Sequence, residues 1–114
     1  RDICEYILVE TCNLFRVDKD DVLHSNKRGI ITEARRMCYA LMKEHLPISD
    51  EQIGMYFKGK SRQFINRELQ NLPLNQDNLS TKDEKKFVND FLCLTVDVLK
   101  YKNSYKLNKK TPTA

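Results

Sequence analysis

Residues 49–70 read SDEQIGMYFKGKSRQFINRELQ, and this stretch decides the fold because it contains two helix starts separated by one break. Ser49 can cap a helix, and Gln52 three residues later completes a capping-box pattern. The apolar residues that follow predict a helix from Asp50 to Phe57. The tripeptide Lys-Gly-Lys then ends this helix, because Gly59 can adopt the positive φ that terminates helices.

A second helix is predicted over residues 61–72, with Ser61 as its cap and with Phe64, Ile65 and Leu69 facing inward. Two short helices joined by a glycine-containing turn form a helix-turn-helix, here over residues 49–72. The long polar side chains on the other side of the second helix are spaced to share one surface; they are Arg62, Gln63, Asn66, Arg67 and Gln70. Arginine can bind guanine, and asparagine and glutamine can bind adenine, so this pattern predicts a helix that reads bases in the major groove.

The chain before this motif also reads as helical. Apolar residues at helical spacing predict helices over Asp2–Phe15 and Ile30–His45, and Pro47 ends the second of them. Asp18 can cap a short helical turn through Leu23, and a polar loop carrying Lys27 and Arg28 follows it. No stretch alternates as a strand would, so the predicted fold class is all-α with about six helices.

After the motif, the segment PLNQDN predicts a loop, and Ser80 with Asp83 starts a long last helix over residues 80–104. The apolar stripe of this helix includes Phe87, Phe91, Leu94, Val98 and Tyr101. We expect residues 105–114 to form a basic, disordered tail. Residues 1–104 are therefore expected to form a single helical domain.

Composition excludes several classes of function. The 114 residues carry a net charge of +4, and no apolar run approaches the roughly 20 residues of a membrane span. The four cysteines form no CxxC pair and only two histidines are present, so we expect reduced core thiols, no metal and no cofactor. Without a catalytic Ser/His/Asp set or a phosphate-binding loop, the chain does not read as an enzyme. A cytoplasmic protein is expected.

The run KRGIITEARRMCYALMKEHLPISDEQIGMYFKGKSRQFINREL, Lys27 to Leu69, resembles the C-terminal DNA-binding domain of the bacterial replication initiator DnaA. The likeness begins with Arg35 and the run MCYALMKE that follows it. It continues in the later motif residues, which are Ser49, Ile53, Gly54, Phe57, Gly59 and Lys60. The upstream segment Leu14–Leu23 also resembles the family. The resemblance implies a DnaA-like or Trp-repressor-like helical fold that binds double-stranded DNA. It also implies a role in replication initiation or regulation in a bacterium, phage or mobile element.

The resemblance further implies which residues contact DNA. The bases would be faced by Ser61, Arg62, Gln63, Asn66 and Arg67, and the backbone or minor groove by Lys27, Arg28, Arg35, Lys58 and Lys60. The family's signature helix normally begins Asp-His-Thr-Thr-Val, whereas this chain has Ser-Arg-Gln-Phe-Ile at residues 61–65. We therefore expect a target site different from the standard initiator box.

Two alternatives stay open at this point. The last helix either covers the core or pairs with a second copy or another protein, because it has a broad apolar stripe that includes Phe87, Val88, Phe91, Leu92 and Leu99. The basic surface would also suit an acidic protein partner, with Arg62 and Arg67 forming salt bridges instead of reading bases.

Overall fold

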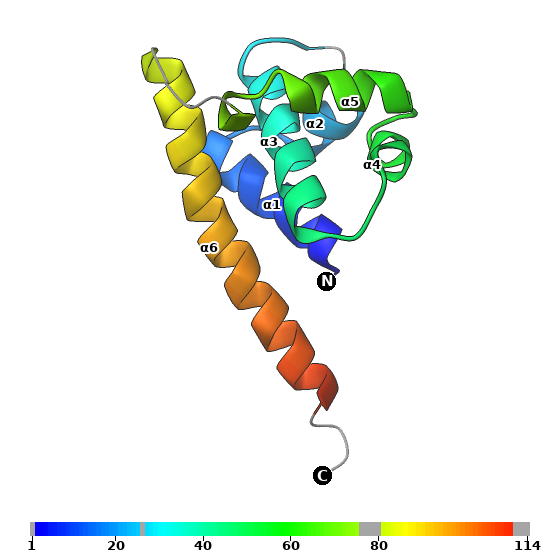
Figure 1. Ribbon diagram of the computed structural model, residues 1–114, viewed down its shortest axis with the longest axis vertical. Coiled ribbons are helices and arrows are strands. Elements are labelled where there is room, and N and C mark those ends of the chain that lie inside the picture. Colours follow the sequence, from blue (N-terminus) through cyan, green and yellow to red (C-terminus); the bar gives the residue numbers. More distant parts are fainter. Residues whose placement is uncertain (1, 26, 76–80, 111–114) are drawn as a thin grey trace.

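A computed structural model describes residues 2–25, 27–75 and 81–110, together with the side chains of these residues up to 74 and from 81 to 104. The described chain consists of helices and contains no strand (Figure 1). In order, they are α1 Ile3–Phe15, α2 Lys19–His24, α3 Ile30–His45, α4 Asp50–Tyr56, α5 Arg62–Gln70, the 3₁₀ turn η1 Pro73–Asn75 and α6 Lys82–Lys110. The predicted all-α class with about six helices and a long last helix is confirmed.

Side-chain caps set where four of these helices begin. Asp2, Asp18, Ser49 and Ser61 each accept a hydrogen bond from a backbone N–H in the first turn of the helix that follows. Each cap satisfies a backbone donor that has no partner within the helix. Ser49 and Gln52 form the complete capping box, with both bonds present. These caps confirm the predicted starts of α1, α2, α4 and α5.

Helix α3 is the centre of the bundle, because it packs against α1, α2, α4, α5 and α6. Most of its length is buried, and Met37, Cys38, Leu41 and Met42 are fully inside. Tyr39 meets Phe57 edge to face, with ring centroids 4.9 Å apart. Burial of this apolar surface supplies the main stabilisation of the fold and fixes the other helices around α3.

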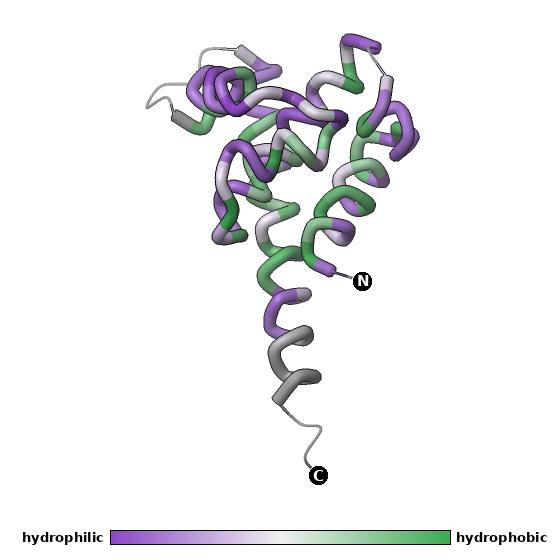
Figure 2. The backbone as a smooth tube through the Cα atoms, turned by 90° about the vertical axis from the view of Figure 1, so that its right-hand side faces the viewer, coloured by the Kyte–Doolittle hydropathy of each residue, from purple (hydrophilic) through white to green (hydrophobic). Residues whose placement is uncertain are grey.

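Helix α6 lies along α1 and α3 and covers one side of the core with Phe87, Leu94 and Val98. Further along, α6 is held by a stacked pair of rings, Tyr6 and Tyr101, whose centroids are 4.0 Å apart. Its C-terminal turns project past the rest of the molecule (Figure 1), and the coloured turns before residue 105 already do so in Figure 2. The predicted core role of its apolar stripe is thus confirmed, although the same helix also extends away from the core.

Both predicted ends of α6 need correction. Thr81 caps the helix, because its hydroxyl accepts from the N–H of Glu84 at 3.1 Å and its own N–H donates to the Glu84 carboxylate at 3.0 Å. The cap predicted at Ser80 lies outside the described residues, as does the part of the PLNQDN loop after Asn75. The helix continues to Lys110 instead of ending at residue 104, because no glycine or proline interrupts this lysine-rich segment. Residues 111–114 lie outside the described residues.

The cysteines do not all behave as predicted. Cys12 and Cys38 are buried, and burial raises the pKa of Cys12 to about 11 and that of Cys38 further still. Cys4 is half-buried. Cys93 is exposed on α6, so the prediction of a core thiol was wrong there, because this residue faces away from the buried stripe.

Two absences hold for the residues that the structure describes. None of the helices in that part of the chain is long and apolar enough to cross a membrane. The same residues bring together no group of three or more histidine, cysteine or acidic side chains that could hold a metal ion.

Candidate nucleic-acid interface

The turn between α4 and α5 is unusually close to α4. The chain reverses through Lys58 and Gly59, which both have positive φ, and the N–H of Lys60 then donates to the carbonyl of Gly54 at 2.9 Å. A Cβ atom on Gly54 would lie only 2.1 Å from the carbonyl oxygen of Lys60. The lack of a side chain at Gly54 therefore allows the turn to fold back onto α4 and sets how α5 leaves it.

Helix α5 is anchored on one side and exposed on the other. Ser61 accepts from the N–H of Phe64 at 3.1 Å and so caps the helix, while Ile65 is 0% exposed and fixes its inner face. On the outer side, all the polar residues singled out from the sequence are exposed; they are Arg62, Gln63, Asn66, Arg67 and Gln70. We call these five residues the α5 ridge. The structure brings them together as one surface.

Half-buried Phe64 supports two cations at the edge of this ridge. The Lys60 ammonium lies 5.1 Å and the Arg67 guanidinium 5.7 Å from the centre of its ring. Cations over aromatic faces gain roughly 0.5–1 kcal/mol at exposed sites. Phe64 therefore holds a residue of the turn and a residue of the ridge near each other, on the same part of the surface.

A chain of polar contacts links the ridge to two other helices. Asp50, at the start of α4, forms an ion pair with Lys43 of α3 at 2.9 Å and accepts from the Asn66 amide at 3.2 Å. The Asn66 carbonyl oxygen in turn accepts from the Gln70 amide at 3.0 Å. The hydrogen bond from Lys43 is the largest cause of a lowered Asp50 pKa; burial opposes it, and the contacts with Asn66 and the charge of Arg62 add to it. Asp50 therefore remains a carboxylate beside the ridge.

The basic loop lies next to the turn. Lys58 of the turn donates to the carbonyl of His24, at the end of α2, at 3.0 Å. Lys27 is 64% exposed and pairs with Asp21 at 3.1 Å, and Arg28 is exposed as well. The contact of Lys58 with α2 thus brings the turn and the loop, two segments far apart in the sequence, to one side of the molecule.

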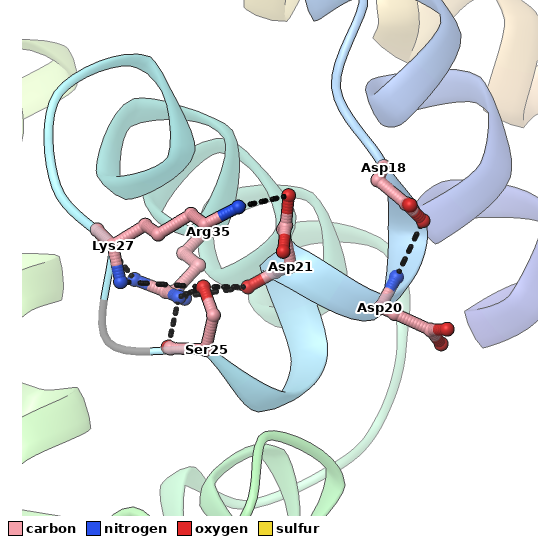
Figure 3. Close-up of polar contacts among 6 residues, drawn as sticks. All are labelled: Asp18, Asp20, Asp21, Ser25, Lys27 and Arg35. Atoms are coloured by element: carbon pink, nitrogen blue, oxygen red, sulfur yellow. Dashed lines mark hydrogen bonds and ion pairs between the residues drawn. The ribbon is translucent and has the colours of Figure 1, made fainter.

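Arg35 differs from the other predicted backbone contacts, because it is buried, with 9% of its surface exposed. Its guanidinium donates to the carbonyl oxygen of Val22 at 2.8 Å. It also donates to the carbonyl oxygens of Asp21 at 2.8 Å, Lys27 at 3.0 Å and Ser25, and to the Ser25 hydroxyl (Figure 3). These donors are occupied within the protein, which argues against the predicted phosphate contact. Arg35 instead fixes the path of the loop that carries Lys27 and Arg28.

The sequence reasoning did not single out Asp50 and Lys43. Asp50 follows the cap of α4, where an acidic residue is expected simply from the helix dipole. Its contact with Asn66 joins residues that are far apart along the chain. Only the packing of α5 across α4 and α3 brings the three side chains together.

Two short helices, a glycine-containing turn and an exposed polar ridge on the second helix define a helix-turn-helix domain, a class that typically binds DNA. The chain belongs to the bacterial DnaA helix-turn-helix family, because the sequence model of that family matches residues 4–70. This membership indicates DNA binding, and the family is not one of enzymes. No curated protein and no solved structure matches the chain. Helix α6 lies beyond the matched residues.

Proposed function

We propose that this chain binds double-stranded DNA with α5 in the major groove and the basic loop at Lys27 and Arg28 on the backbone or in the minor groove. The observation that carries the proposal is the α5 ridge, which is exposed along the outer side of a helix anchored by Ser61 and Ile65 in a DnaA-family chain. The proposed biological role is replication initiation or regulation in a bacterium, phage or mobile element. The protein would then act in the cytoplasm, where bacterial DNA lies.

In this proposal the side chains of α5 choose the sequence. Arg62 and Arg67 would bind guanine, and Gln63 and Asn66 would bind adenine, by the pairings that these side chains favour in the major groove. Ser61 lies at the same end of α5, with its hydroxyl accepting a bond as the cap. Its hydroxyl can still donate a hydrogen bond, so a base contact by Ser61 remains part of the proposal.

The cations around the ridge would supply affinity that does not depend on sequence. Lys58 and Lys60 flank the start of α5, and Lys27 and Arg28 lie on the neighbouring loop. Each phosphate that these residues neutralise releases counterions, so binding should weaken steeply as salt is added. Arg35 contributes indirectly in this proposal, by holding the loop.

Exchanging Arg62 and Lys27 for alanine should separate base reading from backbone binding. We expect Arg62→Ala to cost about 1–3 kcal/mol on the preferred site and little on random duplex, because its contact is with a base. Lys27→Ala should weaken both duplexes alike and lower the salt slope by about 1, because its contact is with phosphate. Fluorescence anisotropy with a site selected from a random library and with a scrambled duplex measures both.

If both variants lose the same affinity on the two duplexes, the assignment of base and backbone contacts is wrong. Binding of random duplex at low and moderate salt tests the function itself. A steep loss with salt supports DNA binding, whereas no binding even at low salt favours the alternative, an acidic protein partner held by Arg62 and Arg67.

We also propose that α6 pairs with α6 of a second copy. Phe87 belongs to the core, but a separate row of exposed apolar side chains remains on this helix: Leu92 at 55%, Val96 at 50% and Leu99 at 47% exposure. Their spacing of four and three residues is that of a two-stranded coiled coil. A dimer would present two α5 ridges to one duplex.

Replacing Val96 by lysine should abolish this dimer, because it places a charge in the middle of the proposed seam. Size-exclusion chromatography with light scattering should give twice the chain mass for the parent protein and the single mass for Val96→Lys. Lys100→Glu, which also changes charge on an exposed position of α6, is the matched control and should remain dimeric. A monomeric parent at the highest concentrations would refute the pairing.

A further inference from the structure

Asp50 is placed to affect the base-reading surface without belonging to α5. Its side chain is 13% exposed and lines, with Arg62, Gln63 and Asn66, a polar hollow of about 430 Å³ beside the start of α5. One of its oxygens pairs with Lys43, and the other accepts from Asn66. A carboxylate in this position is thus held by α3 and in contact with the ridge.

The two contacts of Asn66 determine which way its amide points. A carboxylate can only accept hydrogen bonds, so the Asn66 NH₂ group must face Asp50. Its carbonyl oxygen then faces Gln70, whose NH₂ group donates to it at 3.0 Å. The ion pair with Lys43 keeps the acceptor in place, so the orientation of the amide is fixed from outside α5.

This orientation restricts what Asn66 can read. To bind adenine with both of its groups, an asparagine must donate from its NH₂ group to N7 and accept at its oxygen from N6. In this structure the NH₂ group donates to Asp50 and the oxygen accepts from Gln70. Each contact uses one N–H and one lone pair, so the second N–H and the second lone pair of the Asn66 amide stay available to adenine, in the orientation that Asp50 sets.

We propose that Asp50 is a positioning residue that sets the sequence preference of α5, by holding the Asn66 amide in one orientation so that its free N–H and free lone pair bind adenine at the base pair that faces it. This inference rests on the proposed DNA binding and deepens it. Removal of the carboxylate leaves the Asn66 amide free to rotate, so that it no longer presents one fixed donor and acceptor to the base. Preference for A·T at that one base pair then falls, by about tenfold for a contact of ordinary strength.

The test is selection of bound sites from a random duplex library with the parent protein and with Asp50→Ala. Glu51→Ala is the matched control, because Glu51 is the next acidic residue of the same helical turn and is exposed. Both variants remove one negative charge, so both should raise the overall affinity for DNA. Only Asp50→Ala should change the preferred base at one position.

A double-mutant cycle separates positioning from a general effect on folding. In the Asn66→Ala background, Asp50→Ala should leave the base preference unchanged, because the amide that it releases is absent. Asp50→Asn keeps an acceptor for Asn66 and should retain most of the parent preference. If Asp50→Ala does not fold, as judged by thermal melting followed by circular dichroism, Asp50→Ser provides the same test with a shorter side chain.

The outcomes are distinct. A parent that selects sites, with the same preference in Asp50→Ala or with an equal shift in Glu51→Ala, overturns the positioning role and leaves DNA binding intact. A shift that persists in the Asn66→Ala background overturns it as well. A parent that binds no duplex overturns the proposed function and this inference together.

Discussion

Gly54→Ala should destabilise the protein by about 3 kcal/mol, at the upper end of what overpacking costs in a closely packed site. An added Cβ would lie 2.1 Å from the carbonyl oxygen of Lys60 and 3.0 Å from its carbonyl carbon. Because these are backbone atoms, no rotation of a side chain can relieve the overlap. The turn must move away from α4, which breaks the 2.9 Å hydrogen bond from the Lys60 N–H to the Gly54 carbonyl.

The direction of this effect is informative, because helix propensity alone predicts the opposite. Gly54 lies within α4, where alanine would ordinarily be favoured over glycine by about 1 kcal/mol. Urea unfolding followed by circular dichroism gives the difference in free energy directly. A Gly54→Ala protein as stable as the parent would show that the turn does not depend on this close approach.

Gly59→Ala is the matched control in the same motif. Gly59 has a φ of +69°, and an added Cβ there would meet nothing within 4 Å. Its cost should be about 1 kcal/mol, which is the strain of a left-handed backbone conformation alone. Gly54→Ala should also lose selective DNA binding at temperatures where it remains folded, because the turn positions α5, whereas Gly59→Ala should keep most of it.

The parts of this fold that the sequence predicts well are those fixed by contacts between near neighbours. The capping box of Ser49 and Gln52, the cap at Ser61 and the start of α1 after Asp2 all join residues no more than three apart. Helix α3 begins and ends where it was predicted, because Pro47 stops it. The exposure of the α5 ridge follows similarly from helical spacing.

The parts that were missed depend on contacts between distant residues or on a choice between two local signals. The Asp50–Asn66 bond joins two helices, and nothing near Asp50 in the sequence marks it. At the start of α6, Ser80 and Thr81 are both suitable caps, and the described structure uses Thr81 with Glu84. The contacts that the α5 ridge, Lys27, Arg28, Lys58 and Lys60 would make with DNA remain predictions, and the structure bears on them only through the placement of these side chains.

Arg35 shows a signal that was present in the sequence but was not used. Ile31, Ala34, Cys38 and Met42 form the buried side of α3, and Arg35 falls between them at helical spacing. A charged residue in that position must be buried with partners, since an unpaired buried charge is very costly. Its partners are carbonyl oxygens of residues 21–27, which no local pattern reveals.

Arg35→Met should therefore cost about 3 kcal/mol or more, although methionine can fill much of the same volume. The substitution removes the donor to the carbonyl oxygens of Val22, Ser25 and Lys27, whereas the Asp21 carbonyl still accepts from the N–H and the hydroxyl of Ser25. Each buried acceptor left unpaired costs about 1–3 kcal/mol unless water reaches it. Arg35→Lys should recover little of this, because one ammonium cannot reproduce the planar fork of a guanidinium. Urea unfolding of the three proteins measures the loss.

Arg36→Met is the matched control, because it removes a cation from the neighbouring position of α3 and leaves the hydrogen bonds of Arg35 in place. Arg36 is 38% exposed in its side chain and pairs with Glu33 and Glu68, both at 3.2 Å. Pairs of this kind contribute about 1 kcal/mol or less, so Arg36→Met should stay close to the parent in stability. If Arg35 bound phosphate instead of holding the loop, Arg35→Met would weaken DNA binding at unchanged stability. The hydrogen bonds around Arg35 predict a different result: Arg35→Met lowers stability. DNA binding then falls as a consequence, because the loop carrying Lys27 and Arg28 loses its shape.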